Sequence, residues 1–191
     1  MLLADCSKDD NKTSSCVPPQ YIDFAKINSW IGTSETDVAN ELLQLGFEKK
    51  DDYYEYFSME PYLFVSFSPY SIDGIIQSAG TQYCINVDSY STTLEAFKNC
   101  VNQERQLFKN NNPEYFSGTI RWINLDEGSD RYSGQENYNS YESLISAATE
   151  MSGKRYVELQ WEDRYIDRDA LTISSYMEGG LQEIRMVLSS R

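Results

Sequence analysis

The chain has 191 residues and a mass of 22.0 kDa, which is the size of one ordinary domain. Its 30 acidic and 16 basic side chains give a net charge of −14 and a pI near 4.3. Because a phosphate backbone would be repelled by most of such a surface, we do not expect nucleic-acid binding. The sequence contains no histidine, which excludes Ser-His-Asp and Cys-His catalysis, HExxH zinc sites and histidine-based pH switches.

Residues 1–20 are polar after Leu3 and end in Pro18-Pro19, which cannot continue a helix. We therefore predict a flexible tether over residues 1–20 and a single domain over residues 21–191. No run of residues approaches the roughly 18 apolar positions that a transmembrane helix needs.

The segment Leu3-Ala4-Asp5-Cys6, followed by Lys8-Asp9-Asp10, resembles the lipobox of a bacterial lipoprotein signal peptide and an acidic export signal of the Bacteroidetes type. The resemblance implies that Cys6 is lipidated. It also implies that the protein is anchored in the outer membrane by that lipid and exposed at the surface. The alternative interpretation is a disordered polar N-terminus of a soluble protein.

The first half of the domain predicts one helix and four short strands. Thr33-Ser34 and the acids that follow are typical of a helix start, and Gly46 ends a helix with an apolar stripe. Two antiparallel strands follow, joined by a turn at Glu60-Pro61, and then a second hairpin that turns at Ser78-Ala79-Gly80. The predicted strands are Tyr53–Phe57, Tyr62–Phe67, Ile75–Ile76 and Thr81–Val87.

The second half predicts two helices and four strands. Thr92 and Glu95 form a capping box that opens a helix ending near Asn110, and another helix runs from about Ser140 to Gly153. The polar residues 126–140 indicate a long loop. The predicted strands are Gly118–Leu125, Tyr156–Trp161, Leu171–Met177 and Ile184–Leu188, the last two joined by a turn at Gly179-Gly180.

These elements predict an α+β fold, with an antiparallel sheet of about seven or eight strands and three helices. A helix followed by strands occurs twice, which is compatible with two αβββ repeats.

Four cysteines, Cys6, Cys16, Cys84 and Cys100, lack the C-x-x-C spacing of zinc and thioredoxin-like sites. Cys84 and Cys100 are candidates for a disulfide in an exported protein, or for two thiols that pack as small hydrophobic groups. We expect no metal and no cofactor.

Carboxylates are the one catalytic side-chain type in surplus, and a glycosidase needs only two of them. The candidates are Glu55, Glu158, Glu162 and Asp163. The simpler interpretation is a solvated sheet face, because Glu158, Gln160 and Glu162 alternate along one predicted strand.

Tyrosines invite a binding hypothesis, because an aromatic ring with a hydroxyl group can stack on a sugar or anchor a protein. Tyr54 and Tyr56 share one strand face. The predicted loop adds acids that would steer a basic partner towards it. The predicted partner-binding residues are Asp126, Glu127, Asp130, Tyr132, Tyr138 and Tyr141.

We therefore expect a non-enzymatic cell-envelope lipoprotein that binds a protein or glycan partner. The alternative is a soluble acidic inhibitor or immunity-type protein that blocks a basic toxin or nuclease. A small carboxylate-dependent hydrolase is the third hypothesis.

Overall fold

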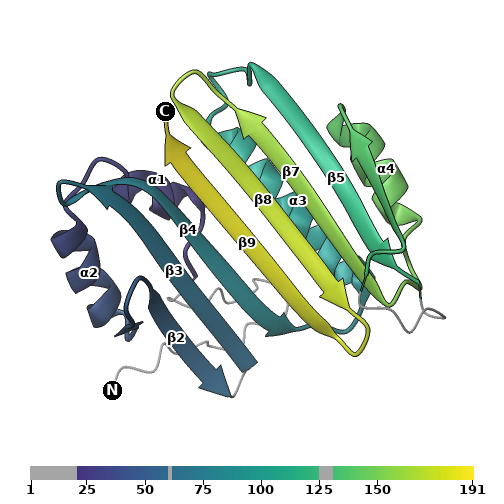
Figure 1. Cartoon of the computed structure of the whole chain (residues 1–191), viewed down its shortest axis with the longest axis horizontal. Coiled ribbons are helices and arrows are strands. Elements are labelled where there is room, and N and C mark those ends of the chain that lie inside the picture. Colours follow the sequence, from purple (N-terminus) through teal and green to yellow (C-terminus); the bar gives the residue numbers. More distant parts are fainter. Residues whose placement is uncertain (1–20, 60–61, 125–130) are drawn as a thin grey trace, which may run out of the picture.

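The computed structural model describes residues 21–59, 62–124 and 131–191 as a mixed α+β fold built on one large antiparallel sheet (Figure 1). Cys6, the tether, the Glu60-Pro61 turn and the acids Asp126, Glu127 and Asp130 lie outside these residues. The helices are α1 (Phe24–Trp30), α2 (Glu35–Gln44), α3 (Tyr90–Leu107) and α4 (Tyr141–Thr149).

In the described residues, nine strands form the sheet in the order β1-β2-β3-β4-β9-β8-β7-β5-β6, and every neighbouring pair is antiparallel. The predicted fold class is therefore confirmed, with one or two strands and one helix more than expected. The strands are β1 (Glu48–Lys49), β2 (Tyr54–Met59), β3 (Tyr62–Ile72), β4 (Ile75–Asn86), β5 (Tyr115–Ile123), β6 (Gly134–Tyr138), β7 (Tyr156–Arg164), β8 (Arg168–Met177) and β9 (Leu181–Ser190).

The helices pack on one face of the sheet, because alternate residues of each central strand are buried beneath them. Figure 1 looks onto the opposite face, and α3 lies behind β7, β8 and β9 in this view. We call this opposite face the open face, since no described element covers it. The row of paired residues that crosses it includes Phe57, Phe64, Cys84, Glu183, Ser175, Glu158 and Arg121.

The helix-covered face holds two hydrophobic clusters. The first lies under α1 and α2 and contains Trp30, Leu42 and Phe67, and the second lies under α3 and α4 and contains Phe97, Leu144 and Trp161. The β4–β9 pair lies at the middle of the sheet, with β2-β3-β4 on one side and β9-β8-β7 on the other. Each of these three-strand groups follows a helix in the chain, α2 and α4 respectively.

Several element predictions are confirmed by the structure. The helix after Ser34 is α2, the strands β2 and β3 pair antiparallel, and α4 begins directly after Ser140. The strands β8 and β9 form a hairpin around Gly179-Gly180. Ile120 and Trp122 share the helix-covered face of β5, as their alternation predicts.

The predicted hairpin at Ser78-Ala79-Gly80 is wrong, because residues 75–86 form the single strand β4. Small residues are needed inside this strand: Ala79 is buried in the core, and a side chain at Gly80 would approach Val187 to 3.2 Å. The chain reverses earlier instead, at Asp73-Gly74 between β3 and β4, and both residues have positive φ.

The predicted start of the second helix is also wrong by one turn. α3 begins at Tyr90, and the N-cap is Ser89, whose hydroxyl group accepts a hydrogen bond from the Thr92 backbone N–H at 3.3 Å. Residues 126–140 are not one loop, since β6 pairs with β5 within them. The sequence of β6 is polar on both faces, which hides a strand at the edge of the sheet.

Candidate functional site

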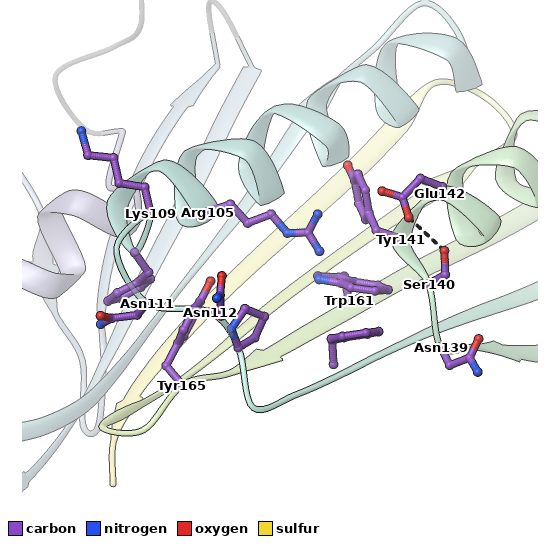
Figure 2. A pocket seen from close by; sticks show the side chains of 13 residues that line it. Arg105, Lys109, Asn111, Asn112, Asn139, Ser140, Tyr141, Glu142, Trp161 and Tyr165 are labelled. Atoms are coloured by element: carbon purple, nitrogen blue, oxygen red, sulfur yellow. Dashed lines mark hydrogen bonds between the residues drawn. The ribbon is translucent and has the colours of Figure 1, made fainter.

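A pocket of about 400 Å³ opens where the end of α3, the loop to β5, the start of α4 and strand β7 meet (Figure 2). This volume is near the lower end of the range for small-molecule sites. The lining side chains are aromatic, amide-bearing or charged. They belong to Arg105, Phe108, Lys109, Asn111, Asn112, Pro113, Phe116, Asn139, Ser140, Tyr141, Glu142, Trp161 and Tyr165.

Arg105 brings a positive charge into this pocket from the last turn of α3. Its Nε donates to Oδ2 of Asp163 at 3.1 Å, and Asp163 is fully buried on β7. The guanidinium carbon lies 4.6 Å from the ring centre of Tyr141 and 5.3 Å from that of Trp161. Both distances are in the range of cation–π attraction, so the ion pair and the two rings together fix the guanidinium group. Figure 2 shows it directed towards these two rings.

Trp161 forms the aromatic floor and is only 1% exposed. Phe116 stacks on its ring with centroids 5.9 Å apart, and Tyr141 meets the ring edge-on at 5.3 Å. Gly118 of β5, the register partner of Trp161, makes room for this arrangement. A Cβ at position 118 would lie 2.8 Å from the Trp161 ring and 3.1 Å from Leu144, so only glycine fits there without displacing α4 or the indole ring.

A buried carboxyl pair lies behind Arg105. Glu104 of α3 is only 2% exposed, and it accepts a hydrogen bond from the Tyr165 hydroxyl group. The pKa of Glu104 is raised to about 8, chiefly by burial and also by the neighbouring Asp163, while the hydrogen bond from Tyr165 and the charge of Arg105 oppose the rise. Glu104 is therefore protonated at neutral pH and can donate its proton to Asp163, whose Oδ1 has no other partner among the described residues.

Two further buried polar atoms of this site are unpaired within the described part of the chain. They are the indole nitrogen of Trp161 and the hydroxyl group of Tyr141, which have no hydrogen-bond partner. Burial raises the pKa of Tyr141 to about 12, so its hydroxyl group keeps its proton. The great majority of buried donors are paired, so these two need a partner, either a ligand or an ordered water molecule, that the described residues do not supply.

The rim of the pocket is polar. Asn111, Asn112 and Asn139 present amide groups, and Lys109 extends from the end of α3 (Figure 2). Glu142 lies in the first turn of α4, where its own backbone N–H and the Ser140 hydroxyl group lower its pKa. It is therefore ionised, and it is the only carboxylate among the described residues that line the pocket.

The structure separates the predicted partner-binding tyrosines. Tyr141 lines the pocket, whereas Tyr132 lies near the ring of Tyr156 and donates to Glu158 at 3.3 Å. Tyr138, the last residue of β6, donates to Glu136. Tyr54 is buried in the core and Tyr56 packs against Phe47, so this pair does not form an exposed binding face.

The carboxylates proposed for hydrolysis are also separated. Glu55, Glu158 and Glu162 lie on the open face, while Asp163 is buried on the other face of the sheet. Glu158 accepts hydrogen bonds from Arg121 and from two tyrosines, Tyr132 and Tyr156. The alternation of Glu158, Gln160 and Glu162 thus marks a partly solvated sheet face, as the simpler interpretation predicts.

Of the two alternatives for Cys84 and Cys100, the disulfide is not formed, since both are free cysteines. Strand alternation places Cys84 on the open face beside Glu183, whereas Cys100 of α3 is buried in the first hydrophobic cluster. The sheet separates the two thiols. Burial raises the pKa of Cys100 to about 11, which keeps this thiol protonated.

Sequence reasoning did not single out Arg105, Glu104 or Trp161 as site residues. Two local signals of the buried carboxyl pair are nevertheless present in the sequence. Glu104 falls within the apolar stripe of α3, three residues after Val101, and Asp163 continues the buried alternation of Leu159 and Trp161 along β7. A carboxylate in an apolar position indicates a buried polar cluster.

Over residues 21–59, 62–124 and 131–191, no cluster of three or more potential metal ligands occurs. In the same residues, no helix is long and apolar enough to cross a membrane. No family model, no curated protein and no solved structure matches the chain.

Proposed function

We propose that this chain is a non-enzymatic binding protein of the cell envelope, and that the pocket beside Arg105 is its ligand site. The observation that carries the proposal is the buried, unpaired indole N–H of Trp161 in the floor of this pocket. A ligand oxygen at this position would provide the missing acceptor.

The lining favours a glycan as the ligand. Sugars carry hydroxyl groups that both donate and accept hydrogen bonds, and the amides of Asn111, Asn112 and Asn139 do the same. Sugars also carry apolar C–H faces that pack on aromatic rings, and Phe116 is 42% exposed at the pocket. The pocket volume suits the end of a glycan chain rather than a long stretch of it.

The placement of the carboxylates supports binding rather than hydrolysis. A glycosidase needs two carboxyl groups that flank the scissile bond. Glu142 lines the pocket, but Glu104 and Asp163 lie behind Arg105 and do not reach its surface. Glu142 is also ionised, as its lowered pKa requires, which makes it a poor general acid.

Calorimetric titration of the full chain with a panel of neutral and acidic oligosaccharides tests this proposal. We expect Phe116→Ala and Asn112→Ala to weaken the binding of the tightest sugar about five- to tenfold each, because each removes a direct contact. The matched control is Tyr115→Ala, which removes an exposed ring from the opposite face of β5 and is expected to change nothing. Equal affinity of the wild type and both pocket variants would overturn the assignment, and release of a shorter sugar would show an enzyme instead.

The resemblance of residues 3–10 to a lipobox supports a lipid anchor at Cys6 in the outer membrane. In the native host, the chain should incorporate labelled palmitate and sediment with the outer membrane. Cys6→Ala should abolish both, whereas Cys16→Ala should leave both unchanged. Membrane association of the Cys6→Ala protein would contradict the anchor.

A protein partner is the second candidate, and an exposed apolar group on the open face favours it. Phe57 and Met59 at the end of β2 are 53% and 68% exposed, and Glu55 lies on the same face. With a net charge of −14, the protein would attract a basic partner, as the acidic-inhibitor hypothesis requires. Such binding would weaken steeply with salt and would be lost in Phe57→Ser, whereas glycan binding would change little in either case.

A further inference from the structure

The guanidinium group of Arg105 uses one of its three nitrogen atoms, Nε, in a hydrogen bond within the described residues. Its Nε is bonded to Asp163, and the Tyr141 and Trp161 rings hold its plane. Its two terminal amino groups make no hydrogen bond to any residue in the described ranges. Because Arg105 lines the pocket, these amino groups are available to a ligand there.

The charges that line or adjoin the pocket balance one another. Asp163 offsets the guanidinium charge, and Glu104 adds no charge of its own at neutral pH because its pKa is raised to about 8. Lys109 is the second cation of the lining, and Glu142 is a carboxylate of the lining whose pKa Arg105 helps to lower. The chain as a whole has a net charge of −14, but the charges at this pocket balance. The two terminal amino groups of Arg105 remain there as N–H donors without an acceptor among the described residues.

We infer that the pocket selects a glycan with an acidic sugar at its end, and that the terminal amino groups of Arg105 bind the sugar carboxylate while Trp161 Nε1–H donates to a neighbouring oxygen. Two parallel N–H donors match the geometry of a carboxylate, and such charge-assisted bonds are about twice as strong as neutral ones. The inference rests on the proposed glycan-binding function and adds the chemical class of the ligand.

The experiment compares three probes by calorimetry: a trisaccharide of galacturonic acid, the same trisaccharide as its methyl ester, and the neutral trisaccharide of galactose. For the wild-type chain we expect the acid to bind at least tenfold more tightly than the other two. The methyl ester has nearly the same shape as the acid, so the difference reports the carboxylate charge.

The key variant is the double substitution Arg105→Gln with Asp163→Asn, which removes the cation and its buried partner together and so leaves no unpaired buried charge. Asp163→Asn alone keeps Arg105, and its unfolding transition shows whether the fold tolerates the substitution on β7. Lys98→Gln removes a cation from the same helix outside the pocket lining and is the charge control. We expect the double variant to bind acid and ester equally, and Lys98→Gln to keep a preference of tenfold or more.

The outcomes separate two claims, that the pocket binds glycans and that Arg105 selects acidic ones. If the wild type binds acid, ester and neutral sugar equally and Phe116→Ala weakens all three, the pocket binds glycans but Arg105 does not select acids, and the inference is wrong. If the acid preference persists in the double variant, the carboxylate is recognised elsewhere, which also overturns it. If none of the three sugars binds, both the inference and the glycan function fall.

Discussion

Two buried indole rings, Trp30 and Trp161, each lie beside a paired cation, one in each hydrophobic cluster of the helix-covered face. A cation lies over each ring: Lys26 is 5.0 Å from the Trp30 centroid and Arg105 is 5.3 Å from that of Trp161. Each cation is paired with a carboxylate, Glu41 in the first case and Asp163 in the second.

The two sites differ in the indole proton. Trp30 Nε1 donates to Glu41 at 2.8 Å, so the carboxylate pairs with the cation and the indole ring together. Trp161 Nε1 has no partner within the described residues, and Asp163 pairs with the cation alone. All polar groups of the first site are paired, whereas the second keeps an indole donor that no described residue accepts.

The largest expected effect concerns the buried pair behind Trp161. The pKa of Glu104 rises from 4.5 unfolded to about 8 folded, so the folded state holds the proton more tightly. The contribution of Glu104 to stability is therefore complete below about pH 4.5 and is lost as pH rises to 8, by up to about 1.4 kcal/mol per pH unit.

Glu104→Gln should remove this slope, since an amide can donate to Asp163 and accept from Tyr165 at every pH. Urea unfolding at pH 5, 6.5 and 8 measures it, and the variant should exceed the wild type most at pH 8. Glu142→Gln, an exposed carboxylate with a lowered pKa, is the control. Parallel pH profiles of the wild type and Glu104→Gln would contradict the protonated pair.

The ion pair beside Trp161 predicts the next effect. Arg105→Gln leaves the buried charge of Asp163 without its cation, which we expect to cost about 3 kcal/mol in the free energy of unfolding. Addition of Asp163→Asn should restore most of that loss. Chemical denaturation of the two single variants and the double variant forms the cycle, and additive losses would show that the two residues do not interact.

Gly118 predicts a smaller effect that acts through shape. Gly118→Ala should destabilise the protein by about 2 kcal/mol, because the new methyl group would meet the Trp161 ring and Leu144. The same variant should lose sugar binding, since the pocket floor moves. The control is Ser117→Ala, at the preceding position and on the open face, which should change the free energy of unfolding by less than about 0.5 kcal/mol. Equal stability of the two variants would mean that the Trp161 ring and Leu144 can move aside without cost, which would contradict this prediction.

The smallest effect compares the two indole rings directly. Trp30→Phe removes a hydrogen bond as well as packing, whereas Trp161→Phe removes a donor that has no partner in the described structure. We therefore expect Trp30→Phe to be more destabilising, by about 1 kcal/mol, as judged from thermal unfolding at one pH. If Trp161→Phe were the more destabilising substitution, the contrast between a paired indole N–H at Trp30 and an unpaired one at Trp161 would be wrong.

The sequence predicts most of the sheet because period-2 alternation is strong in its central strands. Leu63, Val65 and Phe67 of β3 and Val157, Leu159 and Trp161 of β7 are all buried on one face. It does not predict α1, whose seven residues hold only Phe24, Ile27 and Trp30 as buried positions, nor β6, which is polar on both faces. Short or polar elements depend on tertiary contacts that no local pattern records.

The candidate site is less predictable than the fold because its members are far apart in the chain. The aromatic floor and the cation come from three separate elements, with Arg105 in α3, Tyr141 in α4 and Trp161 in β7. The sheet order also brings β5 beside β7, which no local sequence pattern records. Tyr141 lies beside the predicted loop, at the start of the helix expected from about Ser140, and the structure confirms this helix as α4. The buried carboxyl groups gave a local signal, but that signal did not identify Arg105 as the cation paired with Asp163.

The most direct test of the ligand site is the ¹H–¹⁵N spectrum of the three tryptophan indole groups, recorded while the protein is saturated with the tightest-binding oligosaccharide of the panel. Trp161→Phe assigns the Trp161 signal. We predict that this signal shifts on binding as its N–H gains an acceptor, while the Trp30 signal, already bonded to Glu41, stays in place. Saturation that leaves the Trp161 signal unmoved would contradict the assignment of this pocket as the ligand site.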